Sequence, residues 1–315
     1  MADRLLLSAL AAVLGACGGS NNKPEIVVRD ATIDGAAPVI IGATAETVSW
    51  SASPGAGTTS IAAASLASLP AQGNRLATAS GPVAPAGDQV LFAADHLISR
   101  VGIDGAVLRL TTADPEALAG SSDAVPVMAW TLGPVVSWGI DDVQMTATFT
   151  KIDRCDHARV TGQRIYVAAD GASGRRLLRI DQSTGVVTPI TSSSIWAPMF
   201  PGGGMAGATY RGRIVDANDD GALWLIEEMP SRRGIVVLEP VQGEASVLLE
   251  HVTGATGFFA SQEALYWQEG DALLTAPRTG GAASIIASLP GPAGALADGY
   301  VYFTDGAAIE RLRVE

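Results

Sequence analysis

The sequence is poor in the residues that most often carry enzyme and metal chemistry. It holds only 3 histidines and 2 cysteines in 315 residues, and Lys23 and Lys151 are its only lysines. The net charge is −12, with a pI of about 4.7. Nucleic-acid binding requires clustered Lys and Arg, so this composition argues against a nucleic-acid partner.

Long hydrophobic runs and helical periodicity are also scarce. After the N-terminal segment no apolar run reaches the roughly 18 residues typical of a membrane-spanning helix, and the most helix-like stretch is the Ala-rich segment 61–69. Apolar residues nevertheless make up 48% of the chain, together with 36 Gly and 17 Pro. This combination predicts an all-β domain with many turns and a substantial core.

The N-terminus has the layout of a secretory signal. A short polar segment with one positive charge precedes the apolar residues 5–13, which are too few to span a bilayer. Leu14-Gly15-Ala16-Cys17 follows. These four residues resemble the lipobox of bacterial lipoproteins, which implies cleavage before Cys17 and lipid on its thiol. An ordinary secretory signal that happens to end in a cysteine is the alternative.

The resemblance also predicts how the chain is processed and where it is located. We expect residues 1–16 to be a signal peptide, residues 17–24 a lipidated flexible tether and residues 25–315 the folded domain. Gly18 stands where such lipoproteins carry Asp for inner-membrane retention, so the resemblance favours the outer membrane. With Cys17 acylated with palmitate-like chains, Cys155 is left without a disulfide partner, and a hydrophobic core must stabilise the domain.

A short β-rich triplet recurs along the chain at intervals of roughly 42 residues, the spacing of a four-stranded propeller blade. The copies are Val48-Ser49-Trp50, Val90-Leu91-Phe92, Val136-Ser137-Trp138, Ile165-Tyr166-Val167, Leu223-Trp224-Leu225, Leu265-Tyr266-Trp267 and Val301-Tyr302-Phe303. They resemble the repeats of YWTD-type and NHL-type β-propellers. We expect seven blades, with six or eight as alternatives and a pair of β-sandwiches as the competing fold.

The two ends of the domain indicate how the ring closes. Residues 301–315 supply only two or three strands, whereas the β-rich segment 25–33 has no blade of its own. We expect this N-terminal strand to complete the last blade, because a closed ring leaves no long open sheet edge.

The sharpest local motif is DANDDGALWLIE, residues 216–227, which matches the spacing of a calcium-binding loop. Asp216, Asn218 and Asp220 are the candidate ligands. The flanking segments read as strands and place Glu227 too far along to reach a shared ion. An Asx-rich turn between two strands is the alternative interpretation.

Other candidates for chemistry are weaker. Cys155 and His157, two residues apart on an expected strand, would share one face but provide too few metal ligands. The paired carboxylates and residues 201–204 (PGGG) read as solvated turns and loops. Four tryptophans lie within the triplets, where blade packing is expected; Trp196, in the apolar loop 192–205, is a candidate partner contact.

These observations predict a membrane-anchored envelope lipoprotein that acts as a non-enzymatic binding or scaffolding propeller. Its expected partners are the membrane, through the lipid, and envelope proteins or glycans. The alternative is a periplasmic propeller enzyme, a hydrolase or lyase with its site at the central channel. No catalytic residue is predicted, and calcium is the only cofactor that the motifs suggest.

Overall fold

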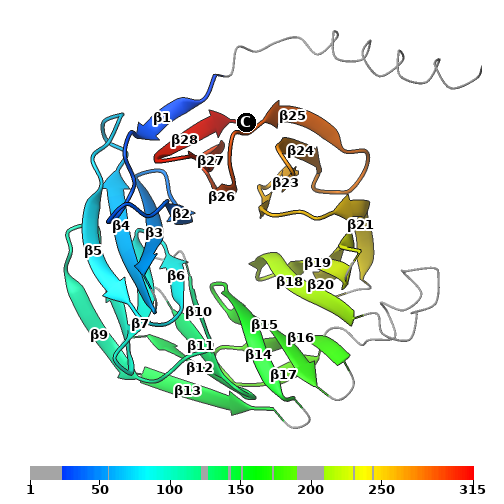
Figure 1. Cartoon of the computed structure of the whole chain (residues 1–315). Coiled ribbons are helices and arrows are strands. Elements are labelled where there is room, and N and C mark those ends of the chain that lie inside the picture. Colours follow the sequence, from blue (N-terminus) through cyan, green and yellow to red (C-terminus); the bar gives the residue numbers. More distant parts are fainter. Residues whose placement is uncertain are drawn as a thin grey trace, which may run out of the picture.

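The computed structural model describes residues 23–55, 57–121, 127–140, 143–149, 152–171, 174–189, 209–229, 231–242 and 245–315. These residues form seven antiparallel sheets of four strands each, arranged as blades around a central axis (Figure 1). No helix occurs within these ranges, and the Ala-rich segment 61–69 contributes to a strand instead. The predicted seven-bladed β-propeller is therefore confirmed.

Each blade is built from consecutive strands, ordered from the central axis outwards. Blade 1 consists of β2 (Val39–Ala43), β3 (Thr47–Gly55), β4 (Thr58–Ser65) and β5 (Asn74–Ala79). Blade 2 consists of β6 (Val83–Ala86), β7 (Gln89–Ala94), β8 (Leu97–Val101) and β9 (Val107–Thr112). Blade 3 consists of β10 (Ala117–Gly120), β11 (Met128–Leu132), β12 (Val135–Ile140) and β13 (Val143–Thr148).

Blades 4 to 6 follow the same order. Blade 4 consists of β14 (Arg154–Val160), β15 (Arg164–Gly171), β16 (Gly174–Asp181) and β17 (Val187–Pro189). Blade 5 consists of β18 (Thr209–Asn218), β19 (Gly221–Met229), β20 (Arg233–Pro240) and β21 (Ser246–Thr253). Blade 6 consists of β22 (Phe258–Ala260), β23 (Ala264–Glu269), β24 (Ala272–Pro277) and β25 (Ser284–Ser288).

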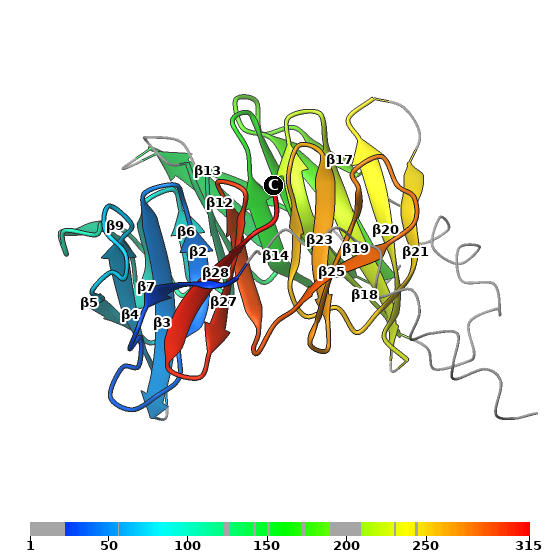
Figure 2. The same ribbon diagram turned by 90° about the horizontal axis from the view of Figure 1, so that it is seen from above.

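Blade 7 joins the two ends of the domain. It consists of β26 (Ala293–Ala297), β27 (Tyr300–Asp305) and β28 (Ala308–Arg313), with β1 (Glu25–Val28) as its outermost strand. β1 pairs antiparallel with β28, and the Glu25 carboxylate lies 2.7 Å from the Arg311 guanidinium. Figure 2 shows the two strands side by side at the edge of the disc. The predicted closure by the N-terminal strand is confirmed.

Most of the predicted triplets lie on the second strand of a blade. That strand is flanked on both sides within its sheet and covered by the neighbouring blades, so it suits a continuous apolar run. Blade 3 is the exception: Trp138 lies on the third strand, β12, and Trp130 occupies the second, β11. The assignment of residues 136–138 as the equivalent triplet was therefore wrong.

The core is divided among the spaces between blades. The buried apolar side chains of the described residues fall into seven clusters, and each cluster combines residues from two adjacent blades. Trp50, Trp138, Trp224 and Trp267 are each at most 2% exposed within these clusters. The predicted role of these four tryptophans in blade packing is confirmed, and every blade depends on both neighbours for its burial.

The inner strands run in parallel around the axis, so the turns between first and second strands share one face of the disc. We call this the first-turn face. One of these turns, Asp298-Gly299, links β26 to β27 with φ angles of 49° and 74°. Two successive positive φ angles define a type I′ hairpin, which favours Asp-Gly. The face thus carries short, well-defined turns around the mouth of the axis.

Candidate functional site: the central channel

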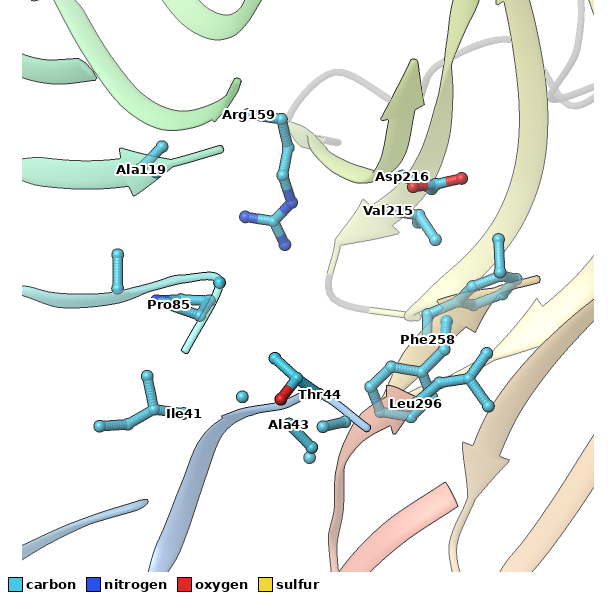
Figure 3. A pocket seen from close by; sticks show the side chains of 18 residues that line it. Ile41, Ala43, Thr44, Pro85, Ala119, Arg159, Val215, Asp216, Phe258 and Leu296 are labelled. Carbon is cyan, nitrogen blue, oxygen red and sulfur yellow. The ribbon is translucent and has the colours of Figure 1, made fainter. Parts of the chain in front are cut away.

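A cavity of about 410 Å³ lies on the axis of the ring, towards the first-turn face. All seven inner strands contribute to its wall, which makes it the central channel of the propeller (Figure 3). Three of its 18 lining residues are polar, namely Thr44, Arg159 and Asp216. The rest are Gly, Ala, Pro and larger apolar residues, including Ile41, Phe258 and Leu296.

Small residues let the inner strands approach closely on one side of this channel. A Cβ added at Gly120 would lie 2.5 Å from the Cβ of Ala86, and one added at Gly294 would lie 2.5 Å from the Cβ of Ile40. Real Cβ atoms do not approach so closely, so larger side chains would push blades 2 and 3, or 7 and 1, apart. These two glycines therefore help set the width of the channel.

Arg159 is the cation of the channel. It lies on the inner strand β14 and extends into the cavity, next to Asp216 and Val215 of the neighbouring inner strand β18 (Figure 3). Its hydrogen bond to the carbonyl of the adjacent Ala158 is long, at 3.4 Å, and no carboxylate of the described residues forms a salt bridge with it. The side chain is reached by the water of the channel although protein surrounds it.

This setting perturbs Arg159 electrostatically. Desolvation among the inner strands lowers the pKa of Arg159; the Asp216 carboxylate opposes this shift and the Arg213 guanidinium adds to it. An arginine stays protonated under all physiological conditions. The consequence is a fixed positive charge in a largely apolar channel.

Asp216 is held by a different arginine. The Arg278 guanidinium, which follows β24, donates to the Asp216 carboxylate at 2.9 Å and also to the Ser261 carbonyl. Both side chains are partly buried. The Asp216 charge is thus neutralised locally, and Arg159 remains the charge in excess.

Repeated contacts between neighbouring turns stabilise the first-turn face. The Asp88 carboxylate of blade 2 accepts from the Thr44 hydroxyl of blade 1 at 2.6 Å. In the same way, the Asp219 carboxylate of blade 5 accepts from the Thr161 hydroxyl of blade 4 at 2.5 Å. Each threonine also accepts backbone N–H groups within its own turn. These bonds fix the turns at the mouth of the channel.

The candidate calcium ligands lie around one of these turns. The flanking segments are strands, as predicted: β18 and β19 are joined by Asp219 and Asp220. The Asn218 side-chain oxygen accepts from the backbone N–H groups of Asp220, at 2.9 Å, and Gly221, at 3.0 Å, which is an Asx-type turn. Asp216 is paired with Arg278 as described. Calcium binding by Asp216, Asn218 and Asp220 stays a prediction.

Glu227 lies far from this turn. It is four residues beyond Leu223, the cross-strand partner of Asp216, which corresponds to roughly 13 Å along a strand. Its carboxylate lies 3.3 Å from the Arg232 guanidinium. Among the described residues, no group of three or more His, Cys, Asp or Glu side chains is placed to hold a metal ion.

Cys155 and His157 do not occupy equivalent positions on β14. A β-bulge at residue 156 makes Cys155 the partner of Ala169 and His157 the partner of Ala168. Successive ladder positions point to opposite faces of a sheet, so the expectation that the two side chains share a face was wrong. Cys155 is fully buried in the core between blades 3 and 4.

Several predicted features lie outside the described residues. They include the signal segment with Cys17, the segment 192–205 with Trp196, and the run 201–204. The described part of the chain contains no helix long and apolar enough to cross a membrane. Arg159 and Arg278 were missed from the sequence because no motif surrounds them. For Arg159, the one signal in the sequence was its position directly after the apolar Ala158 on an expected strand.

The fold and the channel define the chain as a seven-bladed β-propeller. Oligogalacturonate lyase from Vibrio parahaemolyticus has a similar structure, with a TM-score of 0.61 at 9% identity, covering 91% of this chain and 93% of that one. BamB from Moraxella catarrhalis has a TM-score of 0.50 at 15% identity, covering 87% and 85%. The AfRom2 CNH domain has a TM-score of 0.58 at 7% identity, covering 93% and 99%.

At these identities the similarity shows the fold alone. The same architecture occurs in BamB, in a lyase and in prolyl endopeptidases, of which this chain covers 46%. No family model and no curated protein sequence matches the chain. Since one fold hosts many functions, the function must be argued from the site.

Proposed function

We propose that this protein is an exported lipoprotein, anchored by lipid on Cys17 in the outer membrane, whose propeller is a non-enzymatic binding module of the cell envelope. Its partners are envelope components, proteins or glycans, or smaller ligands that enter the channel. The anchor is supported by Leu14-Gly15-Ala16-Cys17, and the tether that follows leads directly into β1 at Glu25.

The channel lining is the observation that carries the binding function. A ring closed by β1 surrounds an accessible cavity of about 410 Å³, lined by apolar side chains, backbone groups and Arg159, which has no salt-bridge partner among the described residues. Apolar cavities with a few placed polar groups are typical of ligand sites. General acid–base catalysis requires a group free to exchange protons, whereas Asp216, the carboxylate of this lining, is engaged by Arg278.

Metabolic labelling with a palmitate analogue tests the anchor. The wild-type chain is expected to incorporate the label and to fractionate with outer membranes. Cys17→Ser should lose the label and the membrane association, because several acyl chains are needed for firm attachment. Cys155→Ser is the matched control: it removes the buried cysteine of the core and should leave labelling unchanged. A Cys17→Ser chain that stayed membrane-bound would contradict the proposed anchor.

Crosslinking in intact cells, followed by pull-down, tests the binding function. A specific set of envelope proteins or glycans should be recovered with the wild-type chain. Turnover of a polysaccharide or lactone by the purified chain, abolished by changes in the channel lining, would instead favour the enzyme alternative.

A further inference from the structure

The charge balance inside the channel differs from that of the molecule as a whole. The chain carries a net charge of −12, yet the channel lining holds one arginine, Arg159, and one carboxylate, Asp216, which pairs with Arg278. Arg278 and Asp216 neutralise each other at 2.9 Å. The remaining charge is the Arg159 guanidinium, whose one hydrogen-bond partner among the described residues is the Ala158 carbonyl.

Such a guanidinium is suited to an anion from outside the chain. Its five N–H donors are arranged in a planar fork that matches a carboxylate in a bidentate geometry. The surrounding protein lowers the effective dielectric constant of the channel relative to bulk water, so the attraction to an anion is stronger there than at the outer surface. Burial that lowers the pKa of Arg159 reflects the same unfavourable solvation of its charge, which an anionic ligand would relieve.

The wall and the charge together restrict the class of ligand. One guanidinium balances one negative charge; a phosphate dianion would leave a second charge without a cationic partner in the channel lining. Across the channel from Arg159 the wall includes the apolar side chains of Phe258 and Leu296 together with the Thr44 side chain (Figure 3). A volume of about 410 Å³ is within the range of small-molecule sites. These features favour a small organic monocarboxylate with an apolar or aromatic body.

The geometry points to the central channel as a binding site for such a monocarboxylate, with Arg159 as the carboxylate receptor and the Phe258 and Leu296 side of the wall in contact with the apolar body. This site deepens the proposed binding function and rests on it for its biological role. Because Asp216 pairs with Arg278, it forms no salt bridge with the Arg159 guanidinium.

Calorimetric titration of the full chain tests the site. Phenylacetate and hexanoate are suitable probes, with phenylacetamide and hexanol as uncharged counterparts of the same shape and inorganic phosphate as the dianion. The two carboxylates should bind, the uncharged counterparts at least about tenfold more weakly, because a charge-assisted pair is lost. Equal binding of acid and amide, or binding of phosphate alone, would overturn the proposal.

Variants with opposite expected effects separate the site from a general loss of structure. Arg159→Gln should weaken carboxylate binding by about 10- to 100-fold. Arg159→Lys should bind more tightly than Arg159→Gln but less tightly than wild type, because lysine carries the positive charge but lacks the bidentate guanidinium. Asp216→Asn should tighten binding several-fold, since it leaves the positive charge of Arg278 unpaired beside the channel. Arg109→Gln, an equal charge change on the exposed face of β9, is the matched control and should have no effect.

The outcomes distinguish this inference from the proposed function. A chain that is lipidated at Cys17 and recovers envelope partners, but binds neither carboxylate, would overturn the channel site alone. A chain that binds carboxylates through Arg159 but is neither lipidated nor membrane-associated would overturn the proposed function and leave the site standing.

Discussion

At the scale of single residues, Glu239 is the side chain whose environment conflicts most with its charge. It lies on β20, is 3% exposed, and its Oε1 has no hydrogen-bond partner among the described residues. Burial raises the pKa of Glu239 from its ordinary value to about 7. An unpaired carboxylate in an apolar setting is costly, so the folded protein favours the protonated acid.

This shift predicts a pH-dependent stability. The pKa of Glu239 is higher in the folded than in the unfolded chain. The stabilisation of the folded state by the protonated carboxyl is therefore fully present below about pH 4.5 and is lost as the pH rises through about 7. Glu239→Gln should remove that dependence. The free energy of unfolding of the variant, measured relative to wild type, should therefore be on the order of 2–3 kcal/mol higher at pH 8 than at pH 5. Urea unfolding at both pH values measures the difference.

The control for this measurement is Glu250→Gln, which alters an exposed glutamate on β21. Its stability should follow the wild-type pH profile. If Glu239→Gln also followed that profile, the Glu239 carboxyl would ionise at the same pH in the folded and unfolded chains, and the expected burial effect would be absent.

The sequence predicts the burial of a residue correctly where the residue belongs to a repeated pattern. It does not predict the orientation of a residue that depends on a local irregularity. The tryptophans of the triplets were correctly expected in the core because alternation along a strand determines burial. Cys155 and His157 were wrongly expected on one face, because a β-bulge leaves no clear mark in a sequence. Arg159 is identifiable as the channel cation only once seven inner strands have been brought around one axis.

At the scale of structural elements, the turn between β18 and β19 is stabilised by its own side chains. Asn218 accepts two backbone N–H groups, and two such bonds together contribute about 1–2 kcal/mol. Asn218→Ala should therefore lower the free energy of unfolding by that amount even in EDTA. Thermal or urea unfolding with and without calcium measures it, with Asn74→Ala on the exposed outer strand β5 as the control.

The same measurement decides the calcium prediction for this loop. A metal site would make the cost of Asn218→Ala larger in calcium than in EDTA, because ligand binding adds to stability only when the site is intact. An Asx-type turn alone would give the same cost in both conditions.

The elements themselves were predictable to different degrees. Second strands stand out because they are apolar throughout, and their spacing predicted the number of blades. In blade 3 both β11 and β12 contain a tryptophan in a β-rich run, so composition could not decide which one is the second strand. Pairing partners, not local propensity, make that distinction.

At the scale of the whole molecule, the core is a closed cycle of interfaces between blades, with no single centre. Each hydrophobic cluster is shared by two neighbours, and the cluster between blades 7 and 1 includes Val27 and Val28 of β1. An open ring would expose this cluster and leave β28 as a free edge. The stability of all seven blades is therefore linked to one short N-terminal strand.

Closure of the ring by β1 predicts that a small change in this strand has a large effect on stability. Val27 is fully buried, whereas its neighbour Ile26 is 37% exposed on the other face of the same strand. Val27→Asp would bury an unpaired charge and should lower the free energy of unfolding by about 3 kcal/mol or more; Ile26→Asp, with the same charge and backbone, should cost about 1 kcal/mol or less. Calorimetry should show one cooperative transition at a reduced temperature for Val27→Asp, because opening the blade 7–blade 1 interface weakens the ring everywhere. A separate early transition, with the remaining blades unfolding at the wild-type temperature, would show instead that closure by β1 stabilises only the blade it completes.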